Sequence, residues 1–161
     1  MEGTLGAFFH ASTTHLERLN AIQQSFVHRL NLTETEAFGR FNLAPLQLRR
    51  DISALGILHK ATLNILPYSL QTMFPPAVRR VHHPTRINAK RHRSQLMDRC
   101  DGGHSALLQS SIFGMVKVYN LLDQETINAT TISLFQRRLT EKARLQSRTD
   151  NEFAYIFCNR R

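Results

Sequence analysis

The chain has 161 residues, which is long enough for one domain with its own core. Its hydrophobic content of 42% excludes a disordered composition. A formal net charge of +9 indicates either a polyanionic partner, such as nucleic acid or anionic lipid, or a solvated basic face. Two cysteines do not make a disulfide framework, and no apolar run is long enough for a membrane span. The first residues lack the basic start and the apolar core that are typical of a signal peptide. We therefore expect no membrane contact and an intracellular location, in the nucleus.

Two helices are predicted near the start of the chain. Thr14 and Glu17 have the spacing of a capping box, and so do Thr33 and Glu36, which open a short helix through about Phe41. The first helix carries apolar residues on one stripe, namely Leu16, Leu19, Ile22, Phe26, Val27 and Leu30. An apolar flank left exposed here, or on the third helix, would indicate a missing partner surface.

The third helix is expected to be the core helix. It runs from Pro45 to about Leu66, and Pro67 ends it. Apolar residues cover most of its circumference, and the only polar strip comprises Arg49, Ser53, Gly56, Lys60 and Asn64. A helix that is apolar on most sides is packed by neighbours on two sides.

Three consecutive charges, Arg49, Arg50 and Asp51, stand at the entrance of this apolar helix and allow two interpretations. In the structural one, they form an ion-pair cluster that clamps the helix end to Arg18 or Arg29 of the first helix. In the functional one, Arg49 faces nucleic acid together with Lys60, which lies on the same polar strip. Asp51→Ala should then destabilise the fold, whereas Arg49→Ala should weaken binding.

A basic segment interrupts the helical pattern after a short helical turn at "YSLQTMF". Residues 79–99 contain seven Lys/Arg against one acidic residue, and a proline with no apolar periodicity predicts a loop. His82, His83 and His92 would add charge only when protonated. Several cations on one surface are what phosphate binding requires, because each neutralised phosphate releases counterions.

Helical periodicity returns over about 105–122 and again from Thr131, where Ile132, Phe135, Leu139 and Ala143 form an apolar stripe. The opposite face of this last helix carries Arg137, Arg144 and Arg148 together with Glu141. These arginines could contact phosphates, or could simply form ion pairs with Glu141 at helical spacing. The closing stretch "EFAYIFCNRR" is compatible with either a strand or a frayed tail.

The predicted class is all-α, with about five helices in an irregular bundle and a basic loop inserted midway. We expect a flexible N-terminus over 1–13, a helical domain over 14–147 that contains the basic loop 79–104, and a tail over 148–161. His92, Cys100 and His104 suit zinc by type, with His82 or His83 as a fourth ligand, but their spacing matches no finger or knuckle. We expect no metal site and no cofactor.

No catalytic motif is present in the sequence. Serine in a Gly-x-Ser-x-Gly elbow, a glycine-rich phosphate cradle and adjacent aspartates are all missing. The chain is therefore expected to be non-catalytic and to bind the backbone of RNA or DNA without reading its sequence. The expected contacts are Arg79, Arg80, Arg86, Lys90, Arg91, Arg93, Arg99, Arg137, Arg144, Arg148, Arg49 and Lys60. The alternative is a helical protein-interaction domain with a solvated basic face.

Several motifs in order resemble the region downstream of the polymerase domain in reverse transcriptases of non-LTR (LINE-like) retrotransposons. The helix "LERLNAIQQSFVHRL" is similar to the family's thumb-proximal helix, and "LAPLQLRRD" resembles its Leu-x-Pro-Leu-x-x-Arg-Arg block. Tyr119-Asn120-Leu121-Leu122 matches an aromatic-Asn-x-Leu-Pro pattern, with Asp123 where proline is usual. Thr131, Phe135 and Leu139 match the last helix.

The resemblance covers about residues 14–145. It implies an all-helical segment that helps to hold template RNA or target DNA against a polymerase domain lost upstream. The family's catalytic aromatic-x-Asp-Asp motif is absent, so the resemblance assigns no catalytic residue.

Overall fold

The computed structural model describes residues 11–77, 92–100 and 106–149, and these form an all-α fold as predicted. Within these residues there are eight α-helices and one 3-10 helix, more than the five expected. Their bounds are α1 Thr13–Arg29, α2 Glu34–Phe41, α3 Leu46–Thr62, α4 Tyr68–Gln71, α5 Ala106–Ser110, η4 Ile112–Gly114, α6 Met115–Asn120, α7 Gln124–Ile127 and α8 Ile132–Thr149. No helix in this part of the chain is both long and apolar enough to cross a bilayer.

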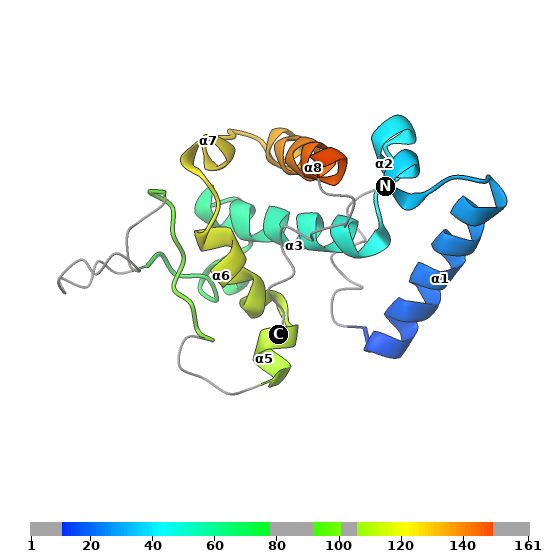
Figure 1. Cartoon of the computed structure of the whole chain (residues 1–161). Coiled ribbons are helices and arrows are strands. Elements are labelled where there is room, and N and C mark those ends of the chain that lie inside the picture. The colour runs from blue at the N-terminus through cyan, green and yellow to red at the C-terminus, as the bar shows by residue number, and fades with distance from the viewer. Residues whose placement is uncertain (1–10, 78–91, 101–105, 150–161) are drawn as a thin grey trace.

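The third helix is the core helix, as predicted. Figure 1 shows α3 crossing the middle of the molecule between α8 and α6, with α1 standing off at one end. Ala54, Leu55 and Leu58 are completely buried. The helix ends at Thr62, earlier than the expected Leu66, because Asn64 adopts a left-handed φ of 55°.

The predicted helix over 105–122 is broken into α5, η4 and α6. Ser111 is extended, and its hydroxyl accepts a hydrogen bond from the backbone N–H of Phe113, which starts a new helical segment. Gly114 passes so close to α5 that a Cβ there would lie 2.0 Å from the carbonyl oxygen of Gln109. The break therefore depends on a close backbone approach that apolar periodicity does not report.

The two predicted capping boxes have different outcomes. Thr33 and Glu36 form one, with the Thr33 hydroxyl accepting from the Glu36 N–H and the Glu36 carboxylate accepting from the Thr33 N–H. The box expected at Thr14 is wrong, because α1 already begins at Thr13 behind an extended Ser12 that makes no side-chain cap. Helix α7 was not anticipated, and Asp123 caps it by accepting a hydrogen bond from the Thr126 N–H.

Candidate nucleic-acid interface

The two ends of the basic segment are held together on the body of the protein. The N–H of Ala77 donates to the carbonyl of Gln95 at 2.9 Å, and the N–H of Met97 donates to the carbonyl of Pro75 at 2.9 Å. An antiparallel β-bridge joins Pro76 to Leu96 between them. We call residues 75–77 and 95–97 the loop base. The described residues on either side of the segment therefore meet at one place.

Asn120, the last residue of α6, attaches the loop base to the helices. Its side-chain amide donates to the carbonyl of Leu96 at 2.8 Å, and its carbonyl accepts from the Leu96 N–H at 2.9 Å. The Leu96 side chain is buried and belongs to the hydrophobic core. The Asn120 side chain thus satisfies the N–H and the carbonyl of a residue 24 positions away. The sequence around Asn120 does not indicate this contact.

His92 is the first described residue after the undescribed stretch 78–91, and it is buried rather than facing solvent. Its Nε2 donates to the carbonyl of Tyr119 at 3.0 Å, and its ring meets the Tyr119 ring edge-on. Burial lowers the pKa of His92, outweighing the hydrogen bond to Tyr119 and the attraction of Asp123. His92 therefore stays neutral at pH 7 and holds the chain end in place.

A second buried histidine, His59 of α3, lies on the other side of Tyr119. Its Nε2 is 2.9 Å from the carbonyl of Ala129, so this nitrogen carries the proton and Nδ1 accepts from the Tyr119 hydroxyl at 3.0 Å. The His59 ring stacks on Phe135 of α8, and burial lowers the pKa of His59. Burial also raises the pKa of Tyr119 to about 12. The network joins α3, α6 and α8 behind the loop base and uses no exposed group.

Five of the predicted contacts lie outside the described residues, namely Arg79, Arg80, Arg86, Lys90 and Arg91. Arg93 is exposed, and its backbone N–H donates to the side chain of Gln124 on α7. The guanidinium of Arg99 lies 5.9 Å from the Phe113 ring centroid. Exposed Lys60 follows His59 near the end of α3, which lies at the same end of the molecule as α7 and the loop base (Figure 1).

The predicted basic face of α8 is interleaved with acidic groups. Arg137 lies 3.8 Å from Glu141 one turn later, and both side chains are mostly exposed. Arg144 is half-buried, and the side chain of Arg148 lies outside the described part. Lys142, a neighbour of this face, forms an ion pair with Asp123. Of the described cations on and beside this face, Arg137 is therefore paired with Glu141 and Lys142 with Asp123.

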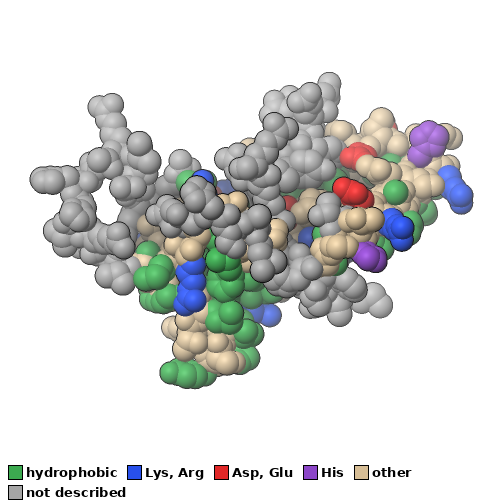
Figure 2. Space-filling model, turned by 90° about the horizontal axis from the view of Figure 1, so that it is seen from below, with side chains coloured by type: hydrophobic (Ala, Val, Ile, Leu, Met, Phe, Trp, Pro, Cys, Tyr) green, Lys and Arg blue, Asp and Glu red, His purple; other side chains and the backbone are tan. Residues whose placement is uncertain are grey.

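The polar strip of α3 does not form a continuous outward surface. Gly56, in the middle of the strip, is buried under α8, and a Cβ there would lie 2.7 Å from the Gln136 side chain. Arg49 and Lys60 therefore lie on either side of the place where α8 crosses. On the face shown in Figure 2, the described Lys and Arg side chains are likewise scattered between hydrophobic and neutral ones.

Arg50 and Asp51 are both 2% exposed, in line with the structural interpretation of this charged triplet. Arg50 donates to the side-chain oxygens of Asn20 on α1, at 3.0 Å, and Gln47, at 2.8 Å, and Gln47 donates to Asp51. The clamp to the first helix thus uses an amide oxygen as the acceptor from Arg50, in place of the expected Arg18 or Arg29.

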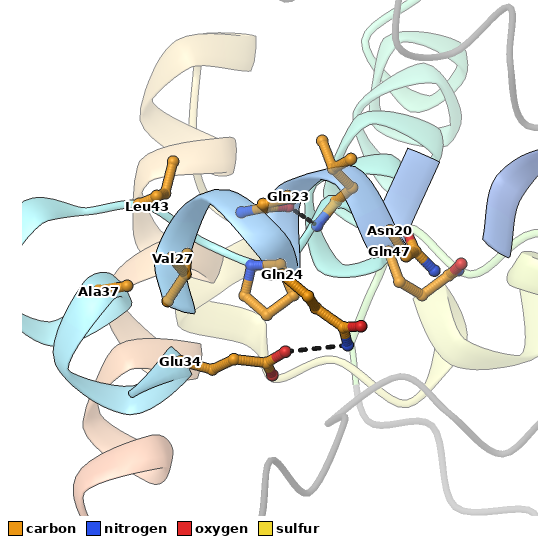
Figure 3. Close-up of a pocket in the computed structure, with 10 residues that line it drawn as sticks. Asn20, Gln23, Gln24, Val27, Glu34, Ala37, Leu43 and Gln47 are labelled. Atoms are coloured by element: carbon orange, nitrogen blue, oxygen red, sulfur yellow. Dashed lines mark hydrogen bonds between the residues drawn. The ribbon is translucent and has the colours of Figure 1, made fainter. Parts of the chain in front are cut away.

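A small pocket lies where α1, α2 and the start of α3 meet (Figure 3). Side-chain amides of Asn20, Gln23, Gln24 and Gln47 line it, and Gln24 donates to the Glu34 carboxylate at 3.1 Å. Its volume of about 50 Å³ is enough for a few water molecules only. The pocket is therefore a narrow crevice between helices.

Among the residues that the structure describes, no cluster of His, Cys, Asp or Glu could hold a metal ion. The Nε2 of His92 is engaged by Tyr119, while His82, His83 and His104 lie outside the described ranges. Comparison with family models, curated proteins and solved structures finds no match to this chain. Any functional assignment therefore rests on the residues themselves.

Proposed function

We propose that this chain is a non-catalytic nucleic-acid-binding module that contacts the phosphate backbone of RNA or DNA through its basic loop. The observation that carries this proposal is the construction of the loop base. Residues 78–91 contain five Lys/Arg and no Asp or Glu, and the chain on both sides of them is fixed to the body. The sequence thus puts five cations between two chain ends that are fixed to the body.

The physical basis is counterion release. Each phosphate neutralised by a cation frees condensed counterions, so the logarithm of the affinity falls linearly with the logarithm of the salt concentration. Five loop cations predict a slope of up to about −4.5, at about −0.9 per phosphate contacted on duplex DNA. Exposed Arg93, two residues before Gln95 of the loop base, would add to the same field, whereas Arg137 faces Glu141 and adds little.

A salt series with two charge-matched triple variants tests this proposal. Affinity for short RNA and DNA duplexes is measured by fluorescence anisotropy for each protein. The loop variant replaces Arg79, Arg80 and Arg86 by glutamine, and the helix variant replaces Arg137, Arg144 and Arg148 by glutamine. The loop variant should lower the steepness of the salt dependence by about 2.7, and the helix variant by less than about 1. Weak binding of the unmodified chain with a flat salt dependence would reject the proposal and favour a protein-interaction domain.

The resemblance to the region downstream of the non-LTR retrotransposon polymerase is part of the same proposal. It is supported by the motif residues, because they make contacts that hold the fold together. Tyr119 and Asn120 hold the core and the loop base, and buried Arg50 clamps α1 to α3. Asp123, which replaces the usual proline, still lets the chain turn after α6 because it caps α7. A polymerase-like reading frame directly upstream in the genome would support this origin, and unrelated sequence there would count against it.

A further inference from the structure

Helix α1 exposes a row of large apolar side chains. Leu19, Ile22, Phe26 and Leu30 are 41%, 67%, 53% and 52% exposed and are spaced three or four residues apart. We call them the apolar stripe. It runs for about 16 Å along the helix at 1.5 Å per residue, which is three turns. A contiguous apolar row of this kind marks an interaction site more often than scattered single residues do.

The stripe is separate from the side of α1 that packs on the body. Gln23 donates to the carbonyl of Ala44 at 2.9 Å and accepts from the N–H of Leu46 at 2.9 Å, which caps the start of α3. Asn20 accepts from Arg50, and Val27 is buried. These residues share the neighbouring face of the helix at 100° per residue. Helix α1 is thus held by amide hydrogen bonds and by Val27, and the apolar stripe remains uncovered.

The charges beside the stripe indicate what can cover it. At 100° per residue, Arg18 and Arg29 lie along one edge of the stripe, opposite the edge that Gln23 holds on the body. Among the described residues, no carboxylate pairs with either arginine. An apolar row with two unpaired cations along one edge is complementary to a helix that carries an apolar row and acidic side chains beside it.

A second copy of this chain fits the stripe poorly. An antiparallel pair of α1 helices would bring Arg18 of one copy beside Arg29 of the other, because the same edges face each other in that arrangement. A parallel pair would turn the arginine edge toward the edge of Gln23, which α3 already occupies. Self-association is therefore opposed by like charge in one orientation and by the body of the protein in the other.

We propose that the apolar stripe of α1 is a docking surface for an amphipathic helix of a partner protein whose flanking residues are acidic. This inference is independent of nucleic-acid binding, since it uses neither the basic loop nor the loop base. It gives the module two separate surfaces, one for a polyanion and one for a protein helix.

The probe is a stapled amphipathic peptide of three to four turns with a leucine stripe flanked by glutamates. The comparison peptide has the same leucine stripe flanked by lysines. The full chain should bind the glutamate peptide at least about tenfold more tightly than the lysine peptide in titration calorimetry. Replacing Arg18 and Arg29 together by glutamate should reverse this preference, a result that a purely structural role of the arginines would not produce.

Phe26→Asp should weaken binding of the glutamate peptide by at least about tenfold. His28→Asp is the matched control, because it places the same carboxylate on the exposed far side of the same helical turn and should leave binding unchanged. Circular dichroism melting checks that both variants fold. No preference between the peptides, or equal effects of Phe26→Asp and His28→Asp, would overturn the proposal. A concentration-dependent dimer in light scattering that Phe26→Asp dissociates would overturn it in favour of a second copy of the chain. Peptide binding that appears only after deletion of residues 150–161 would overturn it in favour of the chain's own C-terminal segment.

Discussion

Replacing Asn120 with alanine removes both hydrogen bonds that hold Leu96 on the end of α6, at 2.8 and 2.9 Å. Losing each bond costs about 1–2 kcal/mol, because it leaves a partly buried backbone group of Leu96 without its partner. The expected loss is about 2–4 kcal/mol. At 1.4 kcal/mol per factor of ten, opening of the loop base should become about 30- to 1,000-fold more frequent.

Native-state hydrogen exchange measures this opening residue by residue. The amides of Leu96 and Met97 should lose protection by about this factor, because the Leu96 N–H donates to Asn120 itself and the Met97 N–H donates to Pro75 within the loop base. The matched control is Asn128→Ala, which removes an exposed side-chain hydrogen bond to Gln124 and should cost less than about 0.5 kcal/mol. If Asn120→Ala changes exchange at Leu96 no more than the control does, the loop base is held by other contacts and the reasoning fails.

Two further predictions concern the core. Burial lowers the pKa of His59 and His92, so the unfolded chain binds more protons below the ordinary value of 6.5, and stability should fall as the pH drops from about 7.5 to 5. Urea unfolding across this range checks the sign, and a midpoint that is constant or rises toward pH 5 would contradict it. Gly56→Ala should be nearly neutral, because about 1 kcal/mol gained in helix propensity offsets the displacement of the flexible Gln136 side chain. Gly56→Leu should cost about 1–3 kcal/mol in the same assay, since it forces α8 away from α3.

Several features of the fold were predictable because they depend on residues close together in the chain. The capping pair Thr33–Glu36 and the apolar circumference of α3 follow from contacts within one or two helical turns. Asn64 could have signalled the earlier end of α3, since asparagine adopts the left-handed conformation more readily than most residues. The Asp123–Thr126 spacing likewise marks the start of α7.

The candidate interface was predictable only in part. The excess of cations over 79–99 is a property of composition and needs no structure. The burial of His92 is different, because it depends on Tyr119 being placed 27 residues away. The ion pair between Arg137 and Glu141, by contrast, could be foreseen from helical spacing.

The sequence by itself determined the helical class, the core helix and the excess of cations over 79–99, because periodicity, capping and local charge act over a few residues. Only the tertiary structure decided which faces meet. It laid α8 across Gly56 and so divided the polar strip of α3, and it fixed Leu96 to Asn120. It also turned the amide face of α1 toward the body, leaving Ile22 and Phe26 exposed. Those choices reflect packing and hydrogen bonds summed over distant segments, and periodicity within one helix carries no information about them.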